Sequence, residues 1–421
     1  MPTISAGALK RMLGLPADVV IGKPRIERDR GVDMVVVPVR PYAGDLNRCA
    51  ECGGHGRPYD RLPARRWRYL DVGCAKLLLE YAPPRVDCGT HGVTVAMVPW
   101  ARRKSAYTRD FERQVAWPGV HAPRGAVSQL MRVDWKSVGP VCRRVADELH
   151  ARRGAGLFDD LRSIGVDETS YRKGHKYMTV VVDHDRGRVI WMHQGHGERV
   201  FDLFFQQLTP EQRASIRVIT GDGARWIGEC AFRWCPMAER ILDGFHVVSW
   251  AADALDRVRA AAWREARRKG VAGKGAKDPI KGARWALLKN EADLTAGRKA
   301  QLECVANTNE TLWAAYKLKE RLRMILKQTP EDAAPLLRRW AADAFLSGIP
   351  GFVPLGEKIA RRHFDILRTI RSGLSNARLE AVNNRIKTTI KIGYGYRNLD
   401  NLIALVMLKC GGLNLKLPGR Q

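Results

Sequence analysis

The feature that most constrains the fold is the stretch Gly165–Gly195, which contains three short apolar runs rich in β-branched residues. Glycine, arginine, lysine and aspartate separate the runs, which cover Ile164–Val166, Tyr177–Val182 and Val189–Met192. This pattern predicts three consecutive antiparallel strands. The first run ends on Asp167, a carboxylate inside an otherwise apolar strand. A buried charge is costly unless it is paired or holds a metal, so Asp167 is either a functional residue or a capping or paired core acid.

Two further carboxylates extend this pattern. Residues 217–223 read RVITGDG, a second β-branched run that ends on an acid, Asp222. The third candidate, Glu380, lies in SNARLEAVNNRIKTTIK, a predicted helix that Ser375 or Asn376 can cap. Its apolar face contains Leu379, Val382, Ile386 and Ile390, and its polar face contains Glu380, Asn384, Lys387 and Lys391. Such acids commonly hold divalent cations beside a phosphodiester, so we expect Asp167, Asp222 and Glu380 to bind Mg²⁺. Lys387 and Lys391 would then face DNA.

The charge of the chain predicts a polyanionic partner. Among 421 residues, 72 Lys and Arg oppose 44 Asp and Glu, which gives a net charge of +28 and a pI near 10.1. Nucleic acid is the usual partner of such a chain. A membrane surface is the weaker alternative, because we find no run of 18 apolar residues and no signal peptide. Nine scattered cysteines indicate a reducing compartment, so we expect a soluble cytoplasmic protein.

Two pairs of metal-ligating residues indicate a zinc module near the N-terminus. Each pair has two residues between its members, and glycines follow the first pair. This spacing is typical of a tetrahedral structural zinc site, and the strand-like segment Trp67–Tyr81 could bring the pairs together. The candidate ligands are Cys49, Cys52, Cys88 and His91. The alternative is four unconnected residues.

A helical region follows the zinc module. The sequence predicts helices over Asp110–Ala116, Ala126–Arg132 and Trp135–Leu149, with Asp134 as the cap of the last and breaks at Pro118, Pro123 and Gly125. Two helices joined by a tight connection indicate a helix-turn-helix, whose last helix would enter the major groove of DNA. The candidate DNA contacts are Lys136, Arg143 and Arg144. A plain helical linker is the alternative.

The order of elements after the first three strands predicts a ribonuclease H-like core. A helix over Glu198–Leu208 precedes a fourth strand, Val218–Thr220, and a helix over Arg225–Trp234 precedes a fifth strand, Arg240–Val248. In that fold the first and fourth strands are neighbours, which would place Asp167 beside Asp222. Asp243 and His246 fall at the predicted end of the fifth strand, near the acids, although a histidine there is often only a hydrogen-bonding residue.

The rest of the chain suggests an insertion in this core. Residues 251–368 carry only helical periodicity, interrupted by the basic stretch Arg264–Arg284, which predicts a solvated loop that could grip phosphates. We therefore expect a multidomain α+β protein in which an all-helical insertion interrupts the ribonuclease H-like core. The predicted parts are an N-terminal segment (1–45), the zinc module (46–105), the helix-turn-helix (106–152), the first part of the core (153–250), the insertion (251–368) and the catalytic C-terminal helix with the tail (369–421).

With these motifs assembled, the chain resembles the ISL-three family of bacterial insertion-sequence transposases, a branch of the DDE transposases. GVDETSYRKGHKYMTVVVD, ITGDGARWIGECAFRWCPMAERILDGFHVV and SNARLEAVNNRIKTTIKIGYGYRN resemble the segments that carry the family's three acids. The resemblance implies that Asp167, Asp222 and Glu380 form the acidic triad and that Asp243 and His246 match a C/D-x-x-H motif of related transposases. One departure is His91, because family members usually close the zinc module with a second CxxC pair.

The function implied is DNA transposition. The protein would bind the terminal inverted repeats of its element and catalyse cleavage and strand transfer with Mg²⁺ or Mn²⁺, supported by structural Zn²⁺. The resemblance also implies that the protein acts as a homodimer on DNA and that it binds target DNA as well as the terminal repeats. It further implies a bacterial protein associated with the nucleoid. Two alternatives stay open: a non-catalytic DNA-binding regulator derived from a transposase, and a nuclease that cuts without joining.

Overall fold

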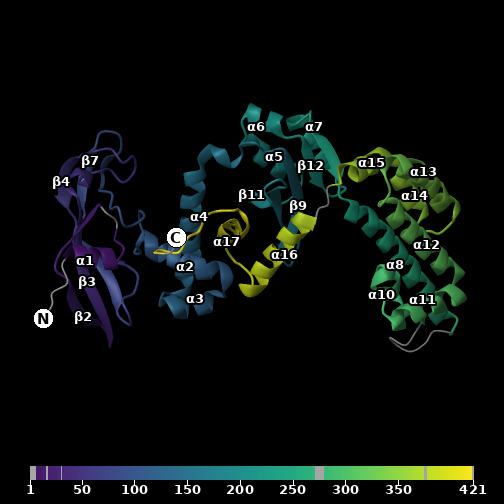
Figure 1. Cartoon of the computed structure of the whole chain (residues 1–421), viewed down its shortest axis with the longest axis horizontal. Helices are drawn as coiled ribbons and strands as arrows, with labels where there is room; N and C mark the ends of the chain where they lie inside the picture. Colours follow the sequence, from purple (N-terminus) through teal and green to yellow (C-terminus); the bar gives the residue numbers. More distant parts are fainter. Residues whose placement is uncertain (1–5, 16–17, 30, 271–278, 374–376, 420–421) are drawn as a thin grey trace. The chain divides into compact units, whose positions relative to one another are not determined.

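The computed structural model describes residues 6–15, 18–29, 31–270, 279–373 and 377–419, which form two units (Figure 1). One unit combines Met1–Gly154 with Ile386–Gln421, and the other comprises Ala155–Arg385. Both units contain helices and strands, so the chain is a multidomain α+β protein, as the sequence predicted. Within the described ranges no helix has the length and apolar character needed to cross a membrane.

The first unit contains two antiparallel-rich sheets. A five-stranded sheet has the order β1-β3-β6-β5, with β2 also paired to β3. Its strands are β1 (Val19–Ile21), β2 (Arg25–Asp29), β3 (Val32–Pro41), β5 (Arg65–Arg68) and β6 (Lys76–Tyr81), preceded by helix α1 (Ala6–Met12). Alternate residues of β6 are buried against Trp67 and Trp100, which explains its period-two pattern. The second sheet consists of β4 (Arg57–Arg61), β7 (Pro84–Cys88) and β8 (Gly92–Val95).

The helices of this unit correct two predicted breaks. Besides α1, they include α2 (Arg109–His121), α3 (Arg124–Met131), α4 (Trp135–Arg153) and α17 (Leu399–Cys410), and α3 contains Gly125, where a break was predicted. Asp134 caps α4 as predicted, because its carboxylate accepts a hydrogen bond of 2.7 Å from the Lys136 N–H. The predicted break at Pro118 is wrong, since α2 continues through this proline. The apolar residues Val115, Ala116 and Val120 are buried on both sides of it, and this packing outweighs the loss of one backbone hydrogen bond.

The second unit is organised around a mixed sheet of five strands. The strands are β9 (Ser163–Arg172), β10 (Lys176–Asp183), β11 (Arg188–Gln194), β12 (Val218–Gly221) and β13 (Glu239–Leu242), in the order β11-β10-β9-β12-β13. The first three are antiparallel, as predicted from their turn residues. Strand β12 pairs in parallel with both β9 and β13.

Helices cover both faces of this sheet. On one face, Ile164 and Val166 of β9 share a buried core with Phe201 and Phe204 of α5 (Glu198–Gln206) and with Ile227 of α7 (Arg225–Trp234). Helix α6 (Pro210–Ser215) lies between α5 and β12 in the chain. Side chains alternate along a strand, so Gly165 faces the opposite side. There a Cβ on Gly165 would lie only 2.3 Å from Cδ1 of Leu379, which shows that helix α16 (Ala377–Ile392) packs closely against β9.

The predicted fifth strand is too long, because it stops at Leu242. Asp243 accepts a hydrogen bond of 3.0 Å from the Phe245 N–H and caps a 25-residue helix, α8 (Gly244–Arg268), so Val247 and Val248 are helical. Two β-branched residues suggested a strand, and the capping aspartate with its glycine decided against it.

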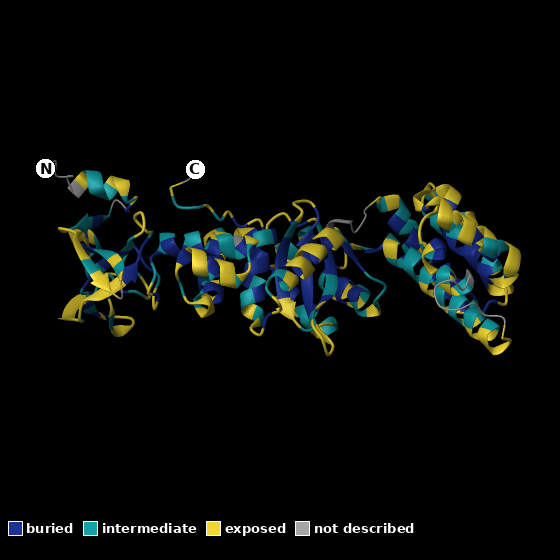
Figure 2. Cartoon of the chain, turned by 90° about the horizontal axis from the view of Figure 1, so that it is seen from below, coloured by how far each residue is buried: buried dark blue, intermediate teal, exposed yellow. Residues whose placement is uncertain are grey.

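The helices that follow α8 share one apolar core with α8 and with Leu242 of β13. They are α9 (Pro279–Gly282), α10 (Arg284–Leu288), α11 (Ala296–Thr308), α12 (Glu310–Ile325), α13 (Pro330–Leu346), α14 (Val353–Arg361) and α15 (His363–Ser372). Leu322, Trp340 and Phe352 are buried at its centre, and exposed residues lie on the outer helix faces (Figure 2). The stretch Arg264–Arg284 is helical at both ends, contrary to the predicted loop, and residues 271–278 lie outside the described ranges, as do Ser375 and Asn376.

The core of the second unit predicts a large difference between two phenylalanines. Phe204→Ala, which removes a fully buried ring beside β9, is expected to lower the free energy of unfolding by about 3–5 kcal/mol. The matched control Phe232→Ala, at a ring that is 79% exposed on α7, is expected to cost less than about 0.5 kcal/mol. Urea unfolding followed by hydrogen exchange in β9–β11 measures both. Equal effects of the two substitutions would contradict this core.

Candidate active site and metal centre

The register of β9 and β12 brings two predicted acids to the same level of the sheet. Thr220 pairs with Gly165 in parallel, so the residues two positions further on, Asp222 and Asp167, lie at the same level of neighbouring strands. Asp222 directly follows β12, whereas Asp167 lies in the middle of β9, which continues to Arg172 beyond the end that the sequence predicted. Backbone N–H groups hold both carboxylates. Asp167 accepts a bond of 2.7 Å from the Glu168 N–H, and Asp222 accepts one of 2.9 Å from the Ala224 N–H. The two side chains therefore have fixed positions.

The surroundings of Asp167 shift its pKa. Burial raises the pKa of its carboxyl group, and the charge of Asp222 raises it further. The Glu168 N–H, the Asn383 amide and the charge of His246 act in the opposite direction on this pKa. Like charges in a half-buried position repel unless a cation lies between them, so this pair has the electrostatic character of a divalent-metal site.

Glu380 lies on the helix that packs against the first acid. Leu379 anchors α16 at Gly165, and the side-chain amide of the buried Asn383 donates a hydrogen bond to Asp167 Oδ2. Glu380 is exposed and lies one turn before Asn383, at a spacing that places Cβ atoms about 5–6 Å apart. Within the described residues, the three carboxylates are not all within 4.8 Å of one another. The structure thus places Glu380 on the adjacent helix without closing the triad.

Asp243 and His246 lie next to the second acid. The Asp243 N–H donates a bond of 3.1 Å to the Gly221 carbonyl, which precedes Asp222. His246 Nε2 lies 3.7 Å from Asp243 Oδ2. Asp243 therefore joins β12 to the start of α8, and His246 is held where its charge acts on Asp167.

Two other acids near the site have structural roles. Glu168 accepts a bond of 2.8 Å from the N–H of Gly197, the residue that caps α5. Asp183 is fully buried and accepts a bond of 3.0 Å from the Arg186 N–H, a contact within the turn that follows β10.

The four predicted zinc ligands lie together at the edge of the small sheet. Cys52 Sγ is 3.7 Å from Cys88 Sγ, and His91 Nδ1 is 3.7 Å from Cys88 Sγ and 3.9 Å from Cys49 Sγ. Zinc bonds of about 2.3 Å to sulfur and 2.0–2.1 Å to nitrogen in a tetrahedron put ligand atoms about 3.5–3.8 Å apart. The cluster Cys49, Cys52, Cys88 and His91 therefore has the composition and spacing to bind zinc.

The electrostatics of this cluster favour a thiolate. The hydrogen bond from His91, assisted by the backbone N–H groups of Thr90 and His91, lowers the pKa of Cys88 to about 6. A thiolate is the form of cysteine that binds metal. All nine cysteines of the chain are free, and the sequence indicated no disulfide framework.

The predicted DNA contacts differ in their surroundings. Lys136 is exposed on α4, and Arg143 is exposed but pairs with Asp400 at 2.8 Å. Arg144 is half-buried, and its Nε donates a bond of 2.6 Å to the buried Glu112 of α2, so it helps to hold α2 against α4. Lys387 and Lys391 are exposed on α16, as its predicted polar face requires.

Three site residues escaped the sequence analysis. Asn383 bonds the first acid, Arg240 donates to the Asp222 carbonyl, and Arg362 donates a bond of 2.7 Å to the Gly223 carbonyl. Asn383 gave a weak signal, since it lies three residues after Glu380. Arg240 and Arg362 gave none, because only the fold brings them to the second acid.

Comparisons with known proteins agree on one family. A family model described as a transposase of the ISL-three type matches residues 164–406, which include all three acids. The transposase for insertion sequence element IS1557 of Mycobacterium tuberculosis is 39% identical over 432 aligned positions, covering 98% of this chain and 97% of that protein. The transposase for insertion sequence element IS1001 of Bordetella parapertussis is 26% identical over 359 positions, covering 84% and 86%.

The Cys–His cluster predicts retention of zinc. The purified chain is expected to keep about one zinc ion after dialysis, and His91→Ala is expected to lose it because a three-ligand site is open. His91→Cys restores a fourth ligand and is expected to keep the ion. Cys74→Ser is the matched control, since Cys74 is exposed and lies outside the cluster. Elemental analysis measures the zinc content of each protein, and a zinc content that His91→Ala leaves unchanged would refute the assignment.

The raised pKa of Asp167 predicts a trade between stability and activity. The folded chain holds this proton more tightly than the unfolded chain, so the ionised carboxylate costs stability above the ordinary aspartate pKa of about 3.9. In metal-free buffer near pH 7, Asp167→Asn should therefore raise the midpoint of thermal unfolding, with a gain that shrinks as the pH falls. Asp253→Asn, at an exposed residue of α8, should leave the midpoint unchanged both near pH 7 and at lower pH. A lower midpoint for Asp167→Asn at pH 7 would contradict the burial of this charge.

Proposed function

Because the chain belongs to the ISL-three family of insertion-sequence transposases, we propose that it cuts and joins DNA at the terminal inverted repeats of its own element. The catalytic centre of this DDE-type reaction is the carboxylate pair Asp167 and Asp222, completed by Glu380. The observation that carries the proposal is the parallel register that sets the first two acids side by side.

The surrounding fold supports this centre. The sheet order β11-β10-β9-β12-β13, with three antiparallel strands followed by two parallel ones, is the arrangement expected of a ribonuclease H-like core. Helix α16 packs on the face of β9 that bears Asp167, which is where a catalytic helix has to lie.

The residues at this centre fit divalent magnesium or manganese. Hard cations take carboxylate oxygens, and burial and the charge of Asp222 raise the pKa of Asp167, so a divalent cation between the two carboxylates would offset their repulsion. Bound Mg²⁺ supplies an activated water or 3′-hydroxyl and stabilises the leaving oxygen of an in-line displacement. Asp167, Asp222 and Glu380 would hold it.

The chain's own groups prepare these carboxylates. The Glu168 N–H and the Asn383 amide fix the two oxygens of Asp167, so that its charged face is oriented before metal arrives. The Ala224 N–H fixes one oxygen of Asp222 in the same way. Asn383 also couples the position of α16 to the first acid, so that movement of Glu380 toward the pair and orientation of Asp167 depend on one helix.

The first unit supplies DNA recognition in this proposal. Structural zinc at the Cys–His cluster stabilises the small sheet, and α2–α4 form a helix-turn-helix that presents Lys136 and Arg143 to the terminal repeat. A homodimer would bridge the two ends of the element and deliver them to target DNA.

The test uses labelled DNA that carries the inverted repeats flanking the gene. The unmodified protein is expected to cleave at the repeat ends and to join them to target DNA in Mg²⁺ or Mn²⁺. Asp167→Ala, Asp222→Ala and Glu380→Gln should each lower the cleavage rate by at least about a hundredfold to a thousandfold while DNA binding persists. Asp253→Asn is the control and should cleave normally.

Two outcomes would contradict the proposal. Specific binding without metal-dependent cleavage by the unmodified protein would favour a regulator that only binds DNA. Cleavage that survives all three substitutions would mean that other acids carry the reaction.

A further inference from the structure

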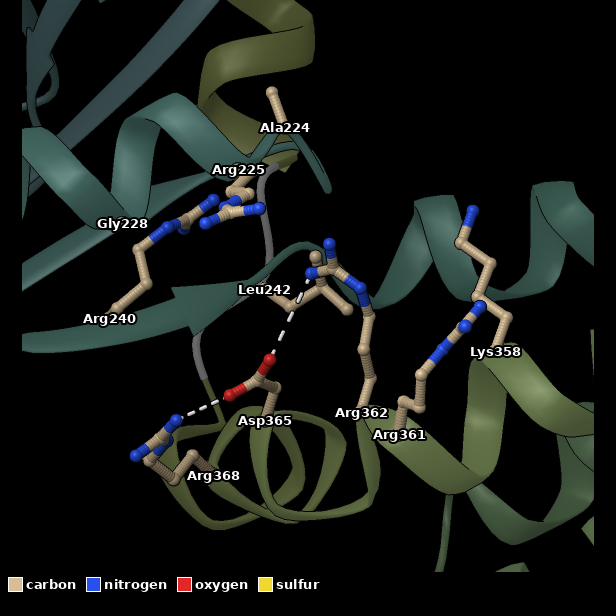
Figure 3. Close-up of a pocket in the computed structure, with 10 residues that line it drawn as sticks. All are labelled: Ala224, Arg225, Gly228, Arg240, Leu242, Lys358, Arg361, Arg362, Asp365 and Arg368. Carbon is tan, nitrogen blue, oxygen red and sulfur yellow. Dashed lines mark hydrogen bonds and ion pairs between the residues drawn. The ribbon is translucent and has the colours of Figure 1, made fainter.

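A strongly basic cavity adjoins the second acid. Its volume is about 710 Å³, and it lies between α7, β13, α14 and α15 (Figure 3). We call it the basic cavity; its lining residues that carry charge are Arg225, Arg240, Lys358, Arg361, Arg362, Arg368 and Asp365. Six cations and one acid line one hollow, which is the composition of an anion-binding site.

Half of these cations form no ion pair with an acid of the described ranges. Asp365 lies between Arg362, at 3.8 Å, and Arg368 (Figure 3), and Glu229 pairs with Arg225 at 2.8 Å. For Arg240, Lys358 and Arg361, none of the acids in the described ranges lies at ion-pair distance. The cavity therefore keeps a positive charge that the protein itself does not neutralise.

Arg240 and Lys358 carry part of this charge. The Arg240 guanidinium donates hydrogen bonds to the backbone carbonyls of Ile219, Ile241 and Asp222, none of which carries a negative charge. Lys358 lies against the ring of Trp250, and burial together with Arg362 and Arg361 lowers its pKa. Half-buried cations that repel one another are stabilised by an anion, so the composition of the cavity and the lowered pKa of Lys358 agree with an anionic ligand.

Backbone groups add to the positive field. Helix α7 has ten residues and begins at the cavity, and its N-cap, Ala224, offers no side chain to the free N–H groups of the first turn. Such groups and the helix dipole attract phosphate. Gly228, one turn further on, also lines the cavity, and a Cβ there would meet only open space.

The basic cavity adjoins the loop that carries the second acid, because Ala224 of this loop lines it. Two lining residues hold the same loop, since Arg240 donates to the Asp222 carbonyl and Arg362 donates to the Gly223 carbonyl at 2.7 Å. The Ala224 N–H in turn bonds the Asp222 carboxylate at 2.9 Å, so residues that line the cavity contact the loop of the second acid directly.

We propose that the basic cavity binds backbone phosphates of the DNA strand next to the phosphodiester held at Asp222. The inference rests on the proposed function for the identity of the strand. Consecutive phosphates of one strand recur at short, regular intervals, so a strand positioned at Asp222 carries further phosphates to this loop. The six cations and the volume exceed what one free phosphate requires, which favours a strand over a small anion.

The test uses a double variant that leaves the acid loop intact. Lys358→Gln with Arg361→Gln removes two cations of α14 that make no hydrogen bond to residues 222–224. The matched control is Lys317→Gln with Arg339→Gln, which removes two exposed cations of α12 and α13. Both full-length variants lose the same net charge, and their thermal midpoints verify that they fold.

The measurement is binding of repeat-end DNA in metal-free buffer, where cleavage does not occur. Single phosphates within about five nucleotides of the cleavage position are replaced by neutral methylphosphonates. The unmodified protein and the control should lose affinity several-fold when one or two of these positions are neutral. The cavity variant should bind unmodified DNA more weakly and should lose no further affinity when the same positions are neutral. Its plot of log binding constant against log salt should also be shallower by about 0.7–0.9 per lost phosphate contact.

Three results would overturn the inference. If the cavity variant and each methylphosphonate weaken binding additively at every position, the cavity contacts none of these phosphates. If both double variants weaken binding equally, only the net charge matters. If inorganic phosphate stabilises the unmodified protein but not the cavity variant, without any coupling to the methylphosphonates, the cavity is a site for a free anion. If the unmodified protein cleaves normally but the cavity variant and the methylphosphonates act independently on binding, this inference alone is refuted. If their effects on binding depend on each other but no cleavage occurs, the proposed function alone is refuted.

Discussion

Two carboxylates of like charge, Asp167 and Asp222, lie at the same level of neighbouring parallel strands, and much of the second unit holds them there. The register of β9 and β12 sets their spacing, and the N–H groups of Glu168 and Ala224 fix their orientation. Burial and mutual repulsion raise the pKa of Asp167, so the arrangement costs stability when no cation is bound. The apolar core under Ile164 and Val166 supplies the stability that makes this arrangement tolerable.

Beyond this pair, the site continues to two arginines that contact backbone carbonyls of the acid loop rather than other acids. Arg240 and Arg362 hold the loop after β12 by its carbonyls, and their remaining surface faces the basic cavity. The helical segment after α8 therefore does more than lengthen the chain, because α14 and α15 bring cations to the loop of the second acid. Negative and positive charges lie on the two sides of one short loop, an arrangement suited to a strand whose phosphates need both metal and cations.

Local patterns predicted the strands around Asp167 and Asp222 because turn residues and β-branched runs specify them without distant contacts. The same reasoning placed the polar and apolar faces of α16 and the cap at Asp134. It failed where tertiary packing or capping decided the outcome: α2 runs through Pro118, and Asp243 starts α8 where two valines suggested a strand. The hydrogen-bond partners of the acids were missed. Asn383 gave only a weak signal through its spacing from Glu380, and nothing in the order of residues places the Arg240 side chain at the loop of Asp222.

We propose that Asp167 and Asp222, with Glu380, form one divalent-metal site. Anomalous X-ray scattering from crystals of the full-length protein bound to a repeat end and Mn²⁺ tests this site directly. We expect manganese coordinated by oxygens of Asp167 and Asp222, with Glu380 drawn in as a further ligand. Manganese bound elsewhere, or a complete complex with no metal between these two carboxylates, would contradict it.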